Sequence, residues 1–314
     1  MEKYVDIDVS KNELDIYHDG SRKSLKISNT LPAIQHWLKE IDCEKKNIKL
    51  IICEATGGYE SLVVEEFKKA KFPVHVVHAN KVRYFAKTTG ALAKTDKIDS
   101  RLLAHYARLF QPQPDEQEIP PETQTLQFFV KRRQQLIKQK VEESNRLDKS
   151  LPAWMKESIE AHITWMEEQI KALEKKLQSH VKNYETLNKE TALLTSVPGI
   201  GLLTSCTLLS DIPELGALSS KSLAALIGVA PFNKDSGRVS KKRSIQAGRA
   251  SVRVALYMAT VASLIHNSPY VKKFYHKIKE KGKPSKVALV ACMRKLLTLL
   301  NSVIKRQTPW VEEF

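Results

Sequence analysis

A proline-rich segment divides the chain into two stretches of different character. Residues 111–121 read Gln-Pro-Gln-Pro-Asp-Glu-Gln-Glu-Ile-Pro-Pro. Proline lacks a backbone N–H, and its ring clashes with the preceding turn of a helix, so no helix can cross this segment. With 314 residues, the chain has enough material for more than one domain. We therefore expect one domain over residues 1–120 and a differently built part after it.

The first 120 residues carry the pattern of an α/β domain. Alternating and β-branched residues predict strands at 3–9, 13–18, 23–28, 48–53 and 74–78, and amphipathic patterns predict helices at 31–41 and 59–70. Asp19-Gly20 is a strong turn signal between the second and third strands. Three antiparallel strands followed by helix, strand, helix, strand is the element order of the RNase H-like fold. Other α/β folds share fragments of this order, so order alone does not decide between them.

The part after the linker is predicted to be mainly helical. Residues 122–150 and 159–190 are long patterns dense in Glu, Lys, Gln and Leu, separated by Leu151-Pro152. They indicate either an antiparallel helical hairpin or a coiled-coil contact between subunits. Further helices are predicted over 249–265 and 286–304. The predicted fold class is α/β plus α, with an N-terminal α/β domain (1–120), a helical oligomerisation region (121–190) and a mainly helical C-terminal domain (191–314).

A glycine-containing turn, Ser196-Val-Pro-Gly-Ile-Gly-Leu202, lies between two apolar helical stretches. This arrangement is typical of a helix-hairpin-helix, in which backbone N–H groups of the turn approach a DNA phosphate. A plain turn that ends one helix and begins the next explains the same residues. The sequence leaves both interpretations open.

Positive charge is concentrated near the C-terminus. The chain has a net charge of +16, and residues 231–314 hold 18 Lys or Arg against 4 Asp or Glu, a net of +14. A basic block this uneven predicts a nucleic-acid partner, because cations displace the counterions condensed on phosphates. The cations that we expect to contact nucleic acid are Arg238, Lys241, Lys242, Arg243, Arg249 and Arg253.

The remaining bulk features exclude several classes of protein. No stretch approaches about twenty uninterrupted apolar residues, so no membrane span is expected, and the start lacks the pattern of a signal peptide. The cysteines form no CxxC pair and are expected to be buried in a reducing compartment, without a zinc site or disulfides. They are Cys43, Cys53, Cys206 and Cys292. A cytoplasmic location is the expectation that follows.

Four carboxylates occupy positions suited to metal binding. Asp8 lies within a predicted strand, although Asp6 shares its face and the strand alone does not choose between them. Glu54 ends an apolar strand, where α/β folds place active residues. Asp96 and Asp99 open a predicted helix and share one face of it. Carboxylates from different elements can hold two Mg²⁺ ions for phosphodiester cleavage, although each one singly could serve an ion pair or a helix dipole.

Ser236 is the candidate nucleophile. It precedes Gly237 in a turn-rich segment and is followed by several cations that could stabilise phosphate oxygens. Ser240 and Ser244 lie equally near these cations, so the residues alone do not single out one serine. No histidine is close in sequence, the nearest downstream being His266. Activation of the serine must therefore come from elsewhere in space.

Five motifs in one order give the chain a family resemblance. They are Ile7-Asp-Val-Ser-Lys11, Glu54-Ala-Thr-Gly-Gly-Tyr59, Lys94-Thr-Asp-Lys-Ile-Asp99, Val197-Pro-Gly-Ile-Gly201, and Gly228-Val-Ala-Pro231 followed by Ser236-Gly237. Together they resemble the bridge-RNA-guided insertion-sequence transposases of the IS one-ten type, whose relatives include the pilin-gene invertase Piv. The resemblance runs from residue 4 to about residue 300.

The resemblance implies a RuvC-like nuclease domain, a coiled-coil connection and a serine transposase domain. The metal-binding DEDD set of the family falls on Asp8, Glu54, Asp96 and Asp99, and its catalytic serine on Ser236. This selects Asp8 over Asp6, which stands where the family usually has glycine. The resemblance also implies cutting and rejoining through a phosphoserine, dimers or tetramers on donor and target double-stranded DNA, and for many members a bridge RNA as guide.

Three other functions remain as alternatives. A site-specific invertase would use the same residues at fixed sites. A RuvC-type nuclease would hydrolyse junctions with the four carboxylates but would leave Ser236 without a role. A non-enzymatic nucleic-acid-binding protein would not need an intact DEDD set. The separation of metal and serine domains further predicts a composite active site, in which one protomer supplies the carboxylates and another supplies Ser236.

Overall fold

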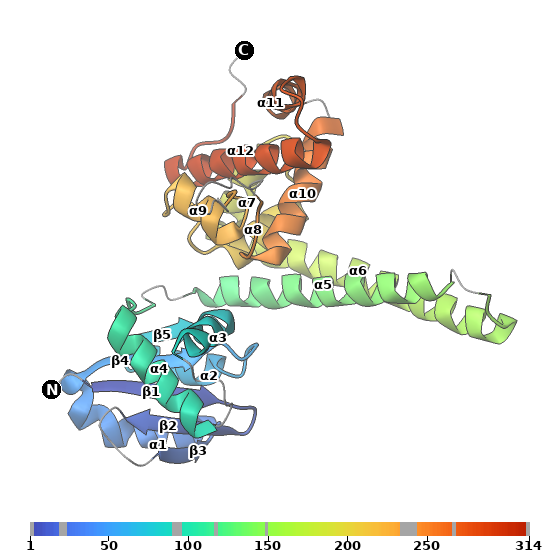
Figure 1. Cartoon of the computed structure of the whole chain (residues 1–314). Helices are drawn as coiled ribbons and strands as arrows, with labels where there is room; N and C mark the ends of the chain where they lie inside the picture. The colour runs from blue at the N-terminus through green and yellow to red at the C-terminus, as the bar shows by residue number, and fades with distance from the viewer. Residues whose placement is uncertain are drawn as a thin grey trace. The chain divides into compact units, whose positions relative to one another are not determined.

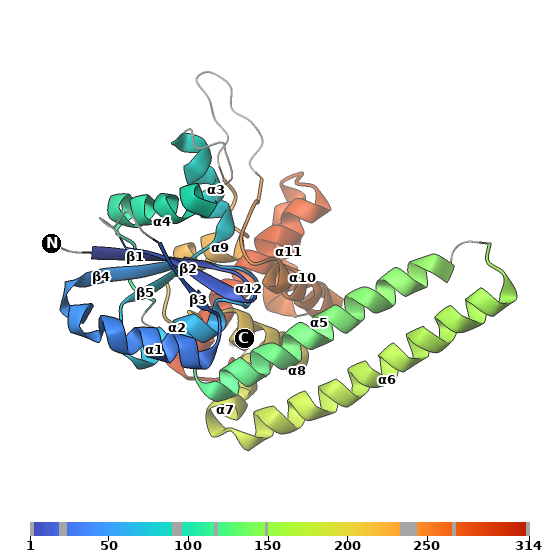
Figure 2. The same cartoon turned by 90° about the horizontal axis from the view of Figure 1, so that it is seen from below.

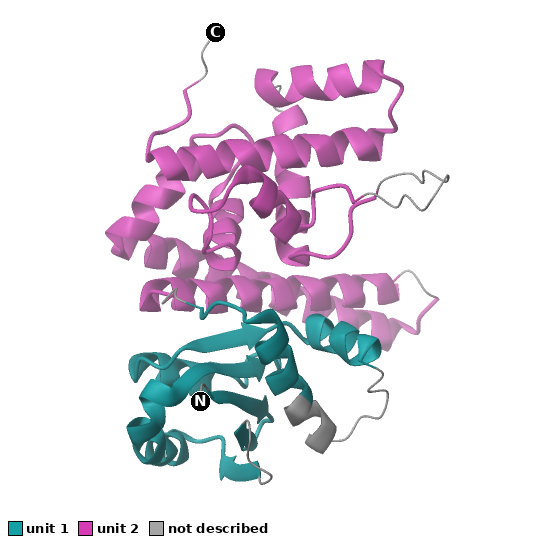
Figure 3. Cartoon of the chain, turned by 60° about the vertical axis from the view of Figure 1, so that its left-hand side comes forward, with its two compact units in different colours: residues 1–118 teal, residues 119–314 magenta. Residues whose placement is uncertain are grey.

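The computed structural model describes residues 3–18, 24–89, 96–115, 119–147, 150–232, 244–265 and 268–311, and of residues 96–101 only the backbone. The predicted turn at Asp19-Gly20 lies outside these residues. The chain divides into two compact units, residues 1–118 and 119–314 (Figure 3).

The first unit contains a five-stranded mixed sheet. Its strands are β1 (Lys3–Val9), β2 (Glu13–His18), β3 (Ser24–Ser28), β4 (Ile48–Glu54) and β5 (Val74–Val77), in the spatial order β3-β2-β1-β4-β5 (Figure 1). β1 pairs antiparallel with β2 and parallel with β4, so it lies at the centre of the sheet. The five predicted strands are confirmed, with ends that differ by no more than one residue.

Helices cover both faces of this sheet, as the view in Figure 2 shows. α1 (Leu31–Ile41) and α2 (Ser61–Lys69) cover one face, and α3 (Ala79–Thr88) and α4 (Asp96–Phe110) cover the other. A short 3₁₀ helix, η1 (Asp42–Asn47), leads from α1 into β4. On the first face, the rings of Trp37 and Phe67 meet at 5.1 Å between centroids, and both side chains are buried. α3 was not among the predicted helices.

On the second face of the sheet, α4 packs over residues of β1 and β4. Tyr4 of β1 and Ile52 of β4 are buried in one apolar cluster with Leu103 and Tyr106 of α4. Side chains alternate between the faces of a strand, so Asp6 and Asp8 share the face of Tyr4. The chain then leaves α4 through the proline-rich linker, whose described residues up to Pro120 form no helix or strand, while Pro121 begins the next helix.

A long helical hairpin begins the second unit. α5 (Pro121–Leu147) and α6 (Ala153–Asn183) pack against each other, with ion pairs from Arg133 to Glu174 (2.6 Å) and from Lys140 to Glu167 (3.2 Å). The hairpin alternative is thus observed within the chain. The expected single helix over 159–190 is wrong in its bounds. The helix begins directly after Pro152, and it ends before Tyr184, whose extended backbone (φ −119°) separates it from α7 (Glu185–Thr195).

The rest of the second unit is helical. It contains α8 (Leu202–Asp211), α9 (Ser220–Ile227), α10 (Ala250–Ile265), α11 (Pro269–Glu280) and α12 (Ser285–Arg306). Leu126 of α5 and Leu177 of α6 are fully buried in the same core as Leu256 and Leu300. The base of the hairpin therefore belongs to the core of this unit, whereas the three-part division at 120 and 190 stays a prediction.

Two sequence expectations concern burial. α12 is 22 residues long and apolar enough to span a membrane by composition, but half of its apolar window is buried inside the protein, as in a core helix. Cys53, Cys206 and Cys292 are buried as expected, whereas the prediction was wrong for Cys43. Cys43 is exposed because it lies in η1, where its thiol donates to the Glu40 carbonyl at 3.5 Å rather than packing inward.

Candidate active site

Three acidic side chains stand in one row across the sheet. Asp8 pairs with Asp15 in the antiparallel register of β1 and β2. In the parallel register of β1 and β4, Ile7 is opposite Cys53, so the next residues, Asp8 and Glu54, are neighbours. Opposed residues point to the same face of a sheet. Glu54, Asp8 and Asp15 therefore lie side by side on the face that α3 and α4 cover.

Asp6 lies deeper under the same face. Its side chain is completely buried, and neither carboxylate oxygen has a hydrogen-bond partner. Burial, together with the nearby carboxylates of Asp8, Glu54 and Asp15, raises the pKa of Asp6 well above its usual range. The sequence placed Asp6 on the correct face but assigned it no role, and it did not single out Asp15.

The other two predicted metal ligands open α4. Asp96 is the first residue of this helix and Asp99 follows one turn later, and α4 packs across β1, β4 and β2. Their side chains lie outside the described ones, so the convergence of all four carboxylates stays a prediction. Among the described side chains, no three His, Cys, Asp or Glu groups form a ready metal-binding cluster. The buried oxygens of Asp6 and one of Asp15 that lack partners nevertheless fit a hard cation such as Mg²⁺, which prefers oxygen ligands.

The turn after Glu54 is built around Glu60. Its Oε2 accepts hydrogen bonds from Thr56 Oγ1 (2.8 Å), from the Thr56 amide (3.1 Å) and from the Gly58 amide (2.9 Å). Burial raises the pKa of Glu60, but these hydrogen bonds outweigh it and lower the pKa overall. Gly57 and Gly58 both have positive φ, which explains the two glycines of the motif. Glu60 therefore holds the end of β4 in place, a role that the sequence analysis missed.

Asn29 joins the two loops that follow the acidic residues. Its Nδ2 donates to the Ser10 carbonyl (3.0 Å), just beyond β1, and to the Tyr59 carbonyl (3.1 Å), beyond β4. Asp8 and Glu54 are thus positioned by connected loops as well as by strand register. An asparagine after a predicted strand carries no signal for this role, because its partners are distant in sequence.

Ser236 lies outside the described residues, as do Gly237, Ser240 and His266, but residues on both sides of its segment are described. The Phe232 amide donates to the Ser244 carbonyl at 3.1 Å, which joins the two sides of the segment. Gly228 and Gly248 have φ of +79° and +77°, and their backbones are in such close contact that a Cβ on either would overlap the other side. The segment between α9 and α10 is therefore closed at its base.

The predicted nucleic-acid contacts fall into two groups. Arg238, Lys241, Lys242 and Arg243 lie outside the described residues. Arg249 makes a bidentate ion pair with Glu214 (2.6 and 2.7 Å) and donates to the Asp211 carbonyl (2.8 Å). Arg253 donates to the carbonyls of Ile227 (3.0 Å) and Ala247. These two arginines thus have structural partners, and DNA contact by any of the six stays a prediction.

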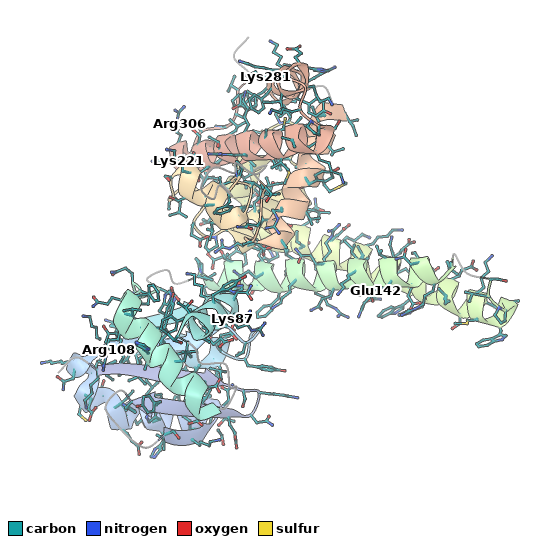
Figure 4. The ribbon with its side chains drawn as sticks, viewed as in Figure 1. Lys87, Arg108, Glu142, Lys221, Lys281 and Arg306 are labelled. Carbon is teal, nitrogen blue, oxygen red and sulfur yellow. The ribbon has the colours of Figure 1, made fainter. Side chains whose placement is uncertain are left out.

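Other cations do lie at the surface of the second unit. Lys221, Lys281 and Arg306 are exposed on this unit (Figure 4).

A cavity of about 730 Å³ lies in the second unit, and its lining is mostly apolar. Its walls include Pro231 and Ser244 from the ends of the Ser236 segment, Phe274 from α11, and Lys286, Arg294 and Lys295 from α12. Lys295 lies 4.5 Å above the ring of Phe274.

The predicted helix-hairpin-helix turn connects α7 to α8. A Cβ on Gly199, whose φ is +89°, would overlap Ser263 of α10, and the Ser263 hydroxyl donates to the Pro198 carbonyl at 2.8 Å. One side of the turn therefore packs against α10. Gly201, in contrast, has open space around it and begins α8.

Comparison with known proteins gives the chain its family. Residues 5–155 match the DEDD transposase model of IS110, and residues 191–276 match the transposase model of the IS116/IS110/IS902 family. The pilin gene-inverting proteins of Moraxella lacunata and Moraxella bovis are each 30% identical over 320 residues, covering 98% of this chain and 97% of theirs. The chain belongs to the IS116/IS110/IS902 transposase family. It is an enzyme of DNA recombination.

A more distant similarity supports the same family. An uncharacterised 42 kDa protein of insertion element IS900 from Mycobacterium paratuberculosis is 28% identical over 122 residues, which cover 38% of this transposase and 30% of that protein. The family model for the first part of the transposase spans β1, β4 and α4, the elements that carry Asp8, Glu54, Asp96 and Asp99. A DEDD transposase of this kind is expected to use a divalent metal and to act on DNA.

Proposed function

We propose that this transposase cuts and rejoins DNA through a covalent phosphoserine at Ser236, supported by two Mg²⁺ ions at Asp8, Glu54, Asp96 and Asp99. The observation that carries the proposal is the adjacency of Asp8 and Glu54 under α4, the helix that begins with the other two carboxylates. The strand order β3-β2-β1-β4-β5, with β1 at the centre, supports a RuvC-like assignment for the first unit.

The chemistry proceeds in two transfers of a phosphoryl group. Attack of the Ser236 hydroxyl oxygen on a DNA phosphorus forms one P–O bond, breaks the bond to the leaving strand and passes the serine proton to the new hydroxyl end. Attack by a hydroxyl end of another strand on the phosphoserine forms a DNA phosphodiester, breaks the bond between the Ser236 oxygen and phosphorus, and passes the proton of the attacking hydroxyl to the serine. Bound divalent ions would activate the attacking oxygen and stabilise the leaving one.

The active site is proposed to be composite and to form in a dimer or tetramer. The carboxylates and Ser236 lie in different units of the chain, and the sequence has no histidine close to Ser236. The α5–α6 hairpin offers a surface for assembly, because Trp154 and Trp165 are 72% and 47% exposed on α6. The two are eleven residues apart, which is three helical turns, so they lie on one face. Apolar aromatic surface of this kind is typical of protein contacts.

The proposed partners are donor and target double-stranded DNA and a bridge RNA that guides the choice of site. The net charge of +14 in residues 231–314 supports binding of a polyanion in this region. The cations proposed to contact it are Arg238, Lys241, Lys242, Arg243, Arg249 and Arg253. Sequencing the nucleic acid that copurifies with the protein tests the RNA, since a guided enzyme should retain one discrete species.

Inversion at fixed DNA sites is the second candidate reaction. The observation that favours it is the full-length similarity to two pilin gene-inverting proteins. The same carboxylates and serine would serve it, and the difference lies in how the DNA sites are chosen. A purified protein that recombines fixed sites without any RNA would support inversion.

Trapping of the covalent intermediate tests the chemistry. Labelled DNA carrying the recombination sites should form an adduct with the wild-type protein on a denaturing gel, and the adduct should be absent from Ser236→Ala. Ser240→Ala is the matched control and should still form it. An adduct that survives Ser236→Ala would contradict the serine assignment. Mixing Ser236→Ala with Asp8→Ala protein should restore part of the activity if the site is composite.

A further inference from the structure

The first observation is a buried carboxyl group without a partner. Asp6 is fully buried at the centre of the sheet, and neither Oδ1 nor Oδ2 makes a hydrogen bond. Buried polar groups are nearly always hydrogen-bonded, because desolvation is costly when nothing replaces water. An apolar side chain would fit this position without that cost, since the strand partner of Asp6 on β4 is Ile52. The carboxyl group therefore needs another explanation.

The surroundings of Asp6 are acidic. The charged side chains that act on it most strongly among the described residues are Asp8, Glu54 and Asp15, all of them carboxylates. Asp15 also has one buried oxygen without a partner, and its other oxygen lies 3.6 Å from Lys26 Nζ. Four carboxylates on three adjacent strands thus share one face, and like charges this close repel one another.

A proton shared between carboxylates does not account for this arrangement. A shared proton relieves the repulsion within one pair of carboxylates, whereas four carboxylates lie on this face. A divalent cation would satisfy the same oxygens, and it would need further ligands, because the described side chains contain no group of three that could hold it. Carboxylate oxygens are the ligands that Mg²⁺ and Mn²⁺ prefer in proteins.

We propose that Asp6 is a fifth carboxylate of the metal site, binding a divalent cation or one of its water molecules from beneath Asp8 and Glu54. The inference rests on the proposed function, because it adds a residue to the same site. Asp6 acts from the floor of the site, where its buried position keeps its oxygens directed at the cation. Asp8 and Glu54, at the ends of their strands, remain the ligands closest to the DNA.

Binding of Mn²⁺ to the full-length protein tests the inference without relying on activity. Isothermal titration calorimetry should show Mn²⁺ binding to the wild type and at least about tenfold weaker binding to Asp6→Asn, the loss typical when a supporting ligand is removed. Asp42→Asn, which removes an exposed carboxylate in η1, is the matched control and should bind as the wild type does. The rise in melting temperature on adding Mn²⁺ should shrink in Asp6→Asn in the same way.

Further variants separate the possible failures. If the proposed metal site is correct, Asp8→Asn should lose Mn²⁺ binding whatever the role of Asp6. If Asp8→Asn loses binding while Asp6→Asn binds as the wild type does, the role of Asp6 is wrong and the proposed function stands. If the wild type binds no Mn²⁺, both are wrong. Should Asp6→Asn not fold, Asp6→Ala, which leaves no unpaired amide in the interior, takes its place with the same expected loss.

Discussion

Arg249, the residue directly before α10, holds the start of that helix in place. It stands in the basic C-terminal region and was predicted to contact nucleic acid. In the structure its guanidinium pairs with both oxygens of Glu214 and also donates to the Asp211 carbonyl. A bidentate pair of this geometry is among the strong charge-assisted interactions. This ion pair holds the start of α10 against the segment that follows α8.

The Glu214 carboxylate should make stability depend on pH. Burial raises its pKa, but the hydrogen bonds from Arg249 outweigh burial and lower the pKa overall. A carboxylate with a lowered pKa stabilises the fold above its unfolded pKa of about 4.3, and this contribution is lost as pH falls through the folded value. Glu214→Gln should therefore lose about 2 kcal/mol at pH 7, and the difference from wild type should shrink progressively as the pH falls below about 4.3.

Melting temperatures of the two proteins across pH 3–8 measure this effect. The exposed Glu157→Gln should melt like the wild type at every pH, because Glu157 has no comparable partner among the described contacts. A difference for Glu214→Gln that stayed constant down to pH 3 would show that packing, rather than the ion pair, is responsible.

At the scale of elements, the segment between α9 and α10 is held by its base. Gly228 and Gly248 allow the two ends to touch backbone to backbone, and Arg253 donates to a carbonyl on each side. These contacts lie directly before and after the part that contains Ser236. Glycine is needed at both positions because of the positive φ and because of the close approach. The motif around Gly228 is therefore explained by the closure of this segment.

Substitution of Gly228 should be much more harmful than substitution of a glycine in open space. Gly282→Ala is the matched control, since Gly282 also has positive φ (+71°) but nothing within 4 Å of a Cβ. We expect a loss of about 1 kcal/mol for Gly282→Ala from backbone strain. Gly228→Ala should lose about 2 kcal/mol more through overlap with Ala247. Thermal unfolding measures both, and equal losses would show that the base of the segment can relax.

The helical hairpin illustrates where element boundaries come from. The break at Leu151-Pro152 was predicted because proline is a local signal, and α6 begins directly after it. The second break, at Tyr184, has no proline or glycine to mark it. The ring of His180 is tilted against that of Tyr184, with 4.9 Å between centroids, and its Nε2 donates to the Glu122 carbonyl of α5 at 2.8 Å. Packing between helices accompanies this break, and packing is not visible in a local pattern.

At the scale of the whole molecule, the two units differ in charge and in composition. The first unit holds the acidic row on its sheet, and the second contains the region of net charge +14. A C-terminal domain of residues 191–314 with this charge would be expected to bind nucleic acid by itself. The structure argues for a longer piece, because Leu126 and Leu177 of the hairpin are buried in the same core as α12. Removing the hairpin would expose that core to water.

Residues 119–314 should bind DNA more tightly than residues 1–118 do. The dissociation constant should increase steeply with salt, because each phosphate contact releases condensed counterions. With six such contacts, affinity would fall roughly a thousandfold between 50 and 200 mM salt. Fluorescence anisotropy with a labelled duplex measures both fragments. Tighter binding by residues 1–118 would contradict the assignment of DNA binding to the second unit.

Local patterns in the sequence were enough to predict the five strands, the proline break and the family, and through the family the residues of the candidate site. These features depend on period-two alternation, on proline chemistry and on short motifs, all of which are read within a few residues. The strand ends at Val9 and Glu54 were therefore predicted to within one residue, and Asp8 and Glu54 could be named as candidate ligands without coordinates.

Only the tertiary structure decided which distant residues meet. Asp15 joins Asp8 through the antiparallel register, Asn29 links two loops, Glu60 closes a turn, and Arg249 is paired with Glu214. Burial likewise distinguishes Asp6, which is sealed under α4, from Asp8 at the end of the strand. Cross-strand register and helix packing bring together residues far apart in the chain, and a local pattern contains no information about such pairs.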